Sequence, residues 1–142
     1  MGKGSRGSIA DRAQAVGMAF GAAAIAAYWV EYFSTGRVRT SDDPSYVDFE
    51  NAFPLADAYM AACLAAGAWH LWRGDVRAVP IGIAAGSALV FVGAMDTLWN
   101  LQHRAYRQRS TEMAIETAIN VASLTFGPIT MVRLWRRRDV LA

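Results

Sequence analysis

Four long apolar stretches alternate with short charged segments along the chain. They span residues 13–33, 54–72, 79–101 and 113–135. Each is close to the length of about 20 residues that a helix needs to cross the hydrocarbon core of a bilayer. A segment inside lipid must satisfy its own backbone hydrogen bonds, and this favours helices. The pattern predicts an all-α fold, an integral membrane four-helix bundle in which residues 1–142 form a single transmembrane domain.

The connections between these stretches differ in length. A short polar turn, Arg73-Gly74-Asp75, joins the second stretch to the third. The connection between the first and second stretches, residues 34–53, is longer, and we expect a short interfacial helix over 45–51 before Pro54. Extra structure is therefore expected at one end of the bundle.

The distribution of positive charge predicts the orientation of the bundle, because cytoplasmic loops carry the excess of Lys and Arg. One side of the predicted bundle holds nine such residues: Lys3, Arg6, Arg12, Arg73, Arg77, Arg133, Arg136, Arg137 and Arg138. The other side holds five: Arg37, Arg39, Arg104, Arg107 and Arg109. Both ends of the chain are therefore expected in the cytoplasm, with the longer connection outside.

Composition agrees with a membrane location. Hydrophobic residues make up 54% of the chain and charged residues 18%, which disfavours an ordinary soluble domain. The sequence pI near 9.0 then reflects topology, and no nucleic-acid partner is expected. Lys3 is the only lysine, and alanine is abundant, a bias typical of GC-rich bacterial genomes. We expect a bacterial cell membrane as the location and the lipid bilayer as a partner.

One face of the third stretch combines small and polar residues at helical spacing. Small residues mark the faces where membrane helices pack closely. The face runs through glycines and then through polar residues: Gly82, Gly86, Gly93, Asp96, Asn100 and His103. The spacing places Asp96 and Asn100 against other helices and away from lipid.

The other stretches carry polar residues at the same predicted depth. Alternating helix directions bring six of them to the outer half of the bundle: Glu31, Asp57, Asp96, Asn100, Glu116 and Asn120. Glu50, just before the second stretch, is expected to cover them. A carboxylate inside a membrane costs at least about 2.5 kcal/mol at mid-bilayer, so such residues are usually functional or paired. For Asp57 and Glu116, in first helical turns, helix capping is an equal alternative.

Metal and cofactor chemistry find little support in the sequence. His70 and His103 are the only histidines and fall on opposite sides, and Cys63 is the only cysteine. Zinc and di-iron sites therefore lack ligands, although oxygen ligands leave a divalent cation as an alternative. Nucleotide-binding glycine motifs are absent from the sequence. We expect no metal and no cofactor.

The leading functional hypothesis is an intramembrane enzyme that performs acid–base chemistry on a lipophilic small molecule, as an isomerase or cyclase does. Asp96 and Glu116 are the expected acid–base pair, followed by Asp57 and Glu31. Residues expected to orient the substrate, exchange a proton with it or flank a developing cation are Asn100, Asn120, His103, Tyr28, Tyr59 and Trp99.

Two other classes of function remain open. The same carboxylates suit a protein that binds or transports a cation or amine. Small four-span multidrug transporters resemble this chain in size and use a glutamate in the first span, whereas Glu31 lies at the end of its stretch. A non-catalytic subunit of a membrane complex would use the polar cluster to hold its helices together. A second copy of the chain is a further candidate partner.

The layout also resembles a known family. Features shared with it are a cytoplasmic amino end, the long outer connection 34–53, the short basic turn at residues 73–75 and acids inside the spans. They resemble the emopamil-binding-protein superfamily, which includes sterol isomerases and sigma-2-like proteins. The resemblance is one of layout, and no site residue is assigned from it. The segments FENAFPLAD (49–57) and DTLWN (96–100) are similar to parts of small actinobacterial membrane proteins, which implies a source.

Overall fold

The computed structural model describes residues 8–141, and it is built from helices. The elements are α1 (Ile9–Ser34), α2 (Pro44–Glu50), α3 (Pro54–Trp72), α4 (Ala78–Gln102), the 3₁₀ turn η1 (Ala105–Arg107) and α5 (Thr111–Leu141). The described residues include no strand, which confirms the all-α prediction. The long helices cover the four apolar stretches and extend a few residues beyond three of them, and α2 occupies the expected short helix.

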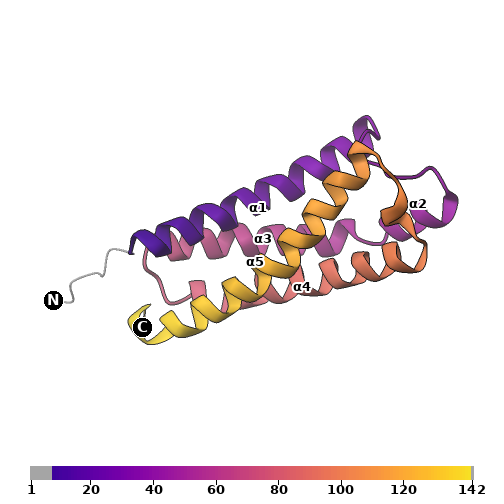
Figure 1. Cartoon of the computed structure of the whole chain (residues 1–142). Helices are drawn as coiled ribbons and strands as arrows, with labels where there is room; N and C mark the ends of the chain where they lie inside the picture. The colour runs from indigo at the N-terminus through magenta and orange to yellow at the C-terminus, as the bar shows by residue number, and fades with distance from the viewer. Residues whose placement is uncertain (1–7, 142) are drawn as a thin grey trace.

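The long helices pack in the order α1, α3, α4, α5. Close packing joins α1 to α3, α3 to α4 and α4 to α5. Figure 1 shows α5 running obliquely to α4, and it places the start of α1 and the end of α5 at the end of the molecule opposite α2. We call these the terminal end and the α2 end. The turn between α3 and α4 lies at the terminal end, and η1 lies at the α2 end.

Local sequence explains where the helices begin and turn. Ser8 caps α1 through a reciprocal pair of hydrogen bonds with Asp11. Proline occupies the first position of both α2 and α3, where its missing N–H is no loss. Gly74, in the turn after α3, adopts a φ of 68°, a conformation that glycine reaches without the Cβ clash of other residues.

Three helices, α1, α4 and α5, are long and apolar enough to cross a membrane. The shorter α3 contains Asp57 and His70, which lower its hydropathy. It packs between α1 and α4, so part of its surface faces neighbouring helices. The longest helix, α5, continues through Pro128.

Polar contacts join α1 to α5 near the terminal end. Arg137 Nη2 lies 2.5 Å from Asp11 Oδ2, and Gln14 Nε2 donates a 2.7 Å hydrogen bond to Thr130 Oγ1. Arg133 also donates a 2.8 Å hydrogen bond to the carbonyl oxygen of Ala10. We call these contacts the α1–α5 clasp. Asp11, Gln14 and Thr130 are buried, whereas the Arg133 contact is exposed, so the clasp extends from the packed interior to the surface.

Candidate functional site

A cavity of about 620 Å³ lies among the four long helices beside α2. This volume falls within the range of about 300–1,000 Å³ that is usual for small-molecule sites. Most of its lining is apolar, as in typical ligand sites. Toward the middle of the bundle its walls carry Gly17 and Gly21 of α1, Leu64 of α3, Leu89 of α4 and Phe126 of α5.

The polar part of the cavity is concentrated near the α2 end. Four carboxyl groups line it, each from a different helix: Glu50 (α2), Asp57 (α3), Asp96 (α4) and Glu116 (α5). Asn120 and Tyr28 line it as well. No Lys, Arg or His is among the described lining residues. The prediction that distant acids share one pocket therefore matches the geometry for Asp57, Asp96 and Glu116, with Glu50 beside them.

Glu116 is held by an amide on the neighbouring helix. The Asn100 amide nitrogen donates a hydrogen bond to Glu116 Oε1, and Asn100 is fully buried between α4 and α5. Asn120, one turn further along α5, donates a 2.9 Å hydrogen bond to the hydroxyl of Tyr106 in η1. Asn120 lines the cavity, whereas Asn100 stands behind Glu116 and orients it.

Asp57 links two helices. Its Oδ2 accepts a 2.8 Å hydrogen bond from the indole N–H of Trp29 in α1. The capping position of α3 belongs to Phe53, which makes no side-chain cap bond. Asp57 is 9% exposed and lies within the first turn of α3. The alternative that it only caps the helix therefore does not describe its contacts.

Glu50 is the last residue of α2 and covers the cavity. Its Oε2 accepts a 3.2 Å hydrogen bond from the hydroxyl of Tyr28, and the residue is 6% exposed. Burial, together with the negative charges of Asp96 and Glu116, raises the pKa of Glu50 to about 8. The side chain is therefore largely neutral at neutral pH.

Several cavity oxygens lack a hydrogen-bond partner among the described residues. They are Oδ1 of Asp57, Oδ1 of Asp96 and Oε2 of Glu116. An unsatisfied polar group in a buried site is costly, and groups of this kind often mark a place where a ligand binds. All three atoms are carboxyl oxygens, so the cavity is equipped to receive hydrogen-bond donors.

Besides Asn100, four residues expected in the site lie outside the cavity lining. Glu31 stands near the end of α1 and bonds to the hydroxyl of Thr35 in the same segment. Tyr59 is 58% exposed, because two residues beyond Asp57 a helical side chain points to nearly the opposite face. The expected roles of these two residues find no geometric support.

Trp99 and His103 form a stack at the α2 end beside the site. The Trp99 ring lies 4.2 Å from that of Phe49 in α2 and 3.7 Å from that of His103. His103 caps α4 and is exposed. The Phe49–Trp99 stack therefore holds α2 against α4, His103 packs on Trp99 at the end of α4, and the cavity itself is bounded by other side chains.

Sequence reasoning missed three aromatic residues that support the site. Trp29 bonds Asp57, Tyr106 bonds Asn120, and Tyr46 of α2 is buried and accepts a hydrogen bond from the backbone N–H of Thr40. Trp29 follows Gly21 and Ile25 at four-residue spacing, on the cavity face of α1. The four-residue spacing indicates that Trp29 lies on the cavity face, but tryptophan is also common at membrane interfaces for reasons unrelated to a binding site.

The fold and the site together define an all-helical protein with an internal cavity that is apolar on one side and acidic on the other. No group of three or more His, Cys, Asp or Glu side chains among residues 8–141 is arranged to hold a metal ion. Comparisons with protein-family models, curated proteins and solved structures find no match for this chain. The chemistry of the cavity must therefore guide the functional interpretation.

Glu50 predicts a pH dependence of stability. Its pKa is raised from 4.5 to about 8 in the folded protein, so the folded state binds this proton more tightly than the unfolded state. The stabilisation is complete below the unfolded pKa and is lost as the pH rises toward 8. Between about pH 5 and pH 9, the thermal midpoint of wild-type protein in detergent should therefore fall more than that of Glu50→Gln.

The matched control is Asp48→Asn, an exposed carboxyl on the same helix. It should keep the wild-type slope, because its charge lies outside the cavity. Glu116, Asp96 and Asp57 also face Glu50 and titrate in all three proteins, so the difference between slopes isolates Glu50. Equal slopes for wild type and Glu50→Gln would contradict the assignment.

Proposed function

We propose that the four long helices cross a bacterial cell membrane, with the terminal end in the cytoplasm and the α2 end outside. The apolar lengths of α1, α4 and α5 support this arrangement. So does the arginine excess at the terminal end, where exposed tryptophans lie beneath arginine side chains. The guanidinium carbons of Arg73 and Arg138 lie 5.3 and 4.4 Å from the ring centres of Trp69 and Trp135.

Within this membrane, the protein acts as an acid–base enzyme of the isomerase or cyclase type on a lipophilic small molecule. One observation carries this proposal: four carboxyl groups from four helices face a single cavity whose remaining lining is mainly apolar. Carboxyl groups that share a site divide their protons unequally. A neutral and an ionised carboxyl group together supply a proton donor and a proton acceptor.

The surroundings of Asp96 and Glu116 suggest how the two roles are divided. Glu116 accepts a hydrogen bond from the Asn100 amide, and a donor of this kind stabilises the charge of a carboxylate, so we assign Glu116 as the proton acceptor. Asp96 presents an oxygen without a partner and serves as the proton donor. Asp96 adds its proton to one carbon of a substrate double bond, and Glu116 removes a proton from the carbon attached to the other carbon of that bond. The double bond moves, and the proton count is unchanged.

The experiment that tests the function does not require a known substrate. Purified protein is placed in vesicles made from a total actinobacterial lipid extract supplemented with polyprenols and sterols, in heavy water. An acid–base isomerase or cyclase places solvent deuterium on carbon, and mass spectrometry detects the gain in a lipophilic compound. Wild type and the exposed-site control Asp48→Asn should both catalyse it. Absence of protein-dependent deuterium gain from the whole extract would count against catalysis.

The carboxyl oxygens without hydrogen-bond partners favour a second candidate function, in which the protein binds or transports a lipophilic amine. An ammonium group would satisfy the free oxygens of Asp57, Asp96 and Glu116 and meet no cation in the described lining. In that case no deuterium is gained. Vesicles that contain the protein should instead take up a quaternary ammonium dye faster than empty vesicles.

A further inference from the structure

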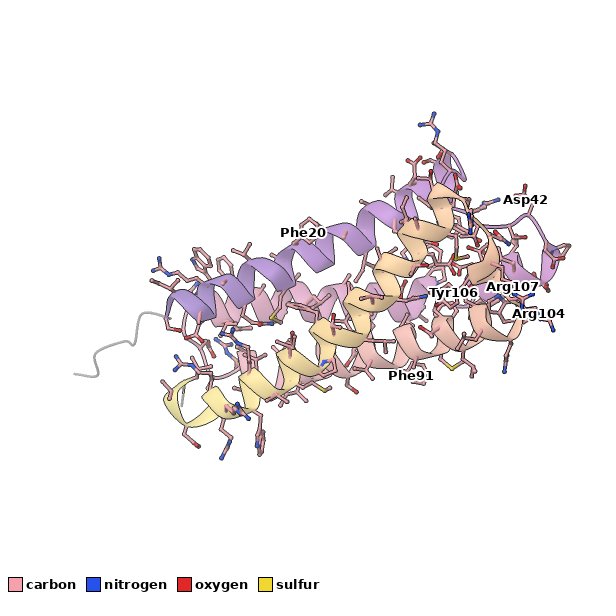
Figure 2. The ribbon with its side chains drawn as sticks, viewed as in Figure 1. Phe20, Asp42, Phe91, Arg104, Tyr106 and Arg107 are labelled. Carbon is pink, nitrogen blue, oxygen red and sulfur yellow. The ribbon has the colours of Figure 1, made fainter. Side chains whose placement is uncertain are left out.

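The cavity wall between α1 and α5 is lined by exposed apolar side chains. Phe20 of α1 lines the cavity and is 75% exposed; Figure 2 shows it near the middle of the helix. Ala24 of α1 and Ala122 and Ile119 of α5 likewise both line the cavity and are exposed. A residue can do both only at the rim of an opening. The cavity is therefore open at its side, between α1 and α5, and we call this opening the α1–α5 gap.

The position of the α1–α5 gap follows from how these two helices are joined. Their hydrogen bonds and ion pair belong to the α1–α5 clasp at the terminal end. Between the clasp and the cavity, the Phe126 ring lies against Gly17. Nearer the α2 end, the described residues form no hydrogen bond or ion pair between α1 and α5. In a bundle that spans a membrane, an opening at this level faces lipid tails.

The polarity of the cavity changes along its length. From Gly17 to Tyr28 the wall formed by α1 rises about 16 Å, at 1.5 Å per residue. The apolar part lies toward Gly17 and the acidic part toward Tyr28. Glu116, which is 4% exposed, lines the acidic part, and its Oε2 has no hydrogen-bond partner among the described residues. A ligand that fits this cavity has an apolar body and a head that donates hydrogen bonds.

We propose that the ligand is a lipid-soluble alcohol or amine that moves sideways from the bilayer through the α1–α5 gap. Its hydroxyl or ammonium head meets Asp57, whose Oδ1 has no partner among the described residues, and its apolar body lies against Gly17, Gly21 and Leu64. Asp96 and Glu116 then act on the carbon atoms of that body. A carboxylate-headed lipid is disfavoured, because its negative charge would meet acidic groups and no cation in the described lining. This inference rests on the proposed function only in that both require the cavity to bind a small molecule.

The test uses three membrane-soluble probes that share one alkyl chain with a light-activated diazirine group and differ in the head: a hydroxyl, an ammonium or a carboxylate. The full chain is reconstituted in phosphatidylcholine vesicles, the probes are activated, and the labelled residues are found by mass spectrometry. Labelling at Phe91, which is 64% exposed on α4 and outside the cavity lining, reports contact with bulk lipid. It serves as the internal reference.

Large side chains at the rim provide the matched variants. Ala24→Trp and Ala122→Trp place a ring at the α1–α5 gap, and both positions are exposed, so the helices need not repack. The controls Ala23→Trp and Val121→Trp put the same ring on the neighbouring exposed residues, which do not line the cavity. Each rim variant should lower cavity labelling at least about tenfold, which corresponds to about 1.4 kcal/mol. The controls should leave it unchanged.

The hydroxyl and ammonium probes should label residues in 17–29 and 115–126, whereas the carboxylate probe should label only the Phe91 reference. If the hydroxyl probe labels the cavity more strongly than the ammonium probe, the ligand is an alcohol, and the reverse result identifies an amine. Equal cavity labelling in rim variants and controls, or by all three probes, would overturn the inference. If the probes label the cavity of the wild-type protein but no deuterium is incorporated, only the catalytic proposal is refuted. Deuterium exchange without cavity labelling would refute the inference alone.

Discussion

Asp96→Asn is expected to lower the rate of solvent-deuterium incorporation at least about 100-fold, the lower range for removal of a general acid. Asp96 lines the cavity from α4 and offers an oxygen with no partner among the described residues. An amide nearly reproduces the shape of the carboxyl group but cannot release its proton to a carbon. The initial rate of deuterium gain in reconstituted vesicles measures the effect.

Two controls separate lost chemistry from lost structure. Asp48→Asn removes an exposed acid from α2 and should keep the wild-type rate. The hydroxyl probe should still label the cavity in Asp96→Asn, because the amide also accepts a hydrogen bond and the cavity keeps its volume. If Asp96→Asn retains the wild-type rate, Asp96 is not the proton donor. If it loses probe labelling as well, the effect is one of binding or folding.

The helices could be predicted because hydrophobic periodicity and length are local properties of the chain. The range 54–72 coincides with α3. Helix α5 runs to Leu141, past its predicted end, because an α-helix can continue through charged residues that follow an apolar stretch. The glycine face of the third stretch was also visible, and Gly82, Gly86 and Gly93 are buried in α4. Small residues at one face leave few alternatives for packing.

The depth of the acidic site was also predictable, but the rotation of each helix was less so. Asp57 and Glu116 could have been capping residues, and only the neighbouring Trp29 and Asn100 show that they bond between helices. Glu31 and Tyr59 lie near the correct depth and still miss the cavity. A side chain's direction changes by about 100° per residue on a helix, so a small error in the assumed face moves a residue out of a site.

The contacts of α2 illustrate a second limit. Phe49 stacks on Trp99, and Glu50 bonds to Tyr28. Both contacts bring residues together across connections whose course depends on the whole packed bundle. The sequence indicated that Glu50 would cover the acids, because it directly precedes α3. The stack of Phe49 on Trp99 had no comparable signal, since aromatic residues at a membrane interface are common for other reasons.

Gly86→Ala is expected to cause the largest loss of stability. A Cβ at Gly86 would lie 2.7 Å from the carbonyl oxygen of Gly127, and a Cβ at Gly127 would lie 2.7 Å from the carbonyl oxygen of Gly86. The two backbones touch where α4 crosses α5, so relief requires one helix to move. Overpacking of this kind costs about 1–3 kcal/mol, measured as a lower thermal midpoint in detergent.

Gly21→Ala is the matched control, because its new methyl group would lie 3.4 Å from Leu64 Cδ1, an ordinary contact with a flexible side chain. It should keep the wild-type midpoint. A wild-type midpoint for Gly86→Ala would show that the α4–α5 crossing is looser than these contacts indicate. The same crossing orients Asp96 of α4 relative to Glu116 of α5. A shift of either helix should therefore lower deuterium incorporation as well, although both carboxyl groups remain present.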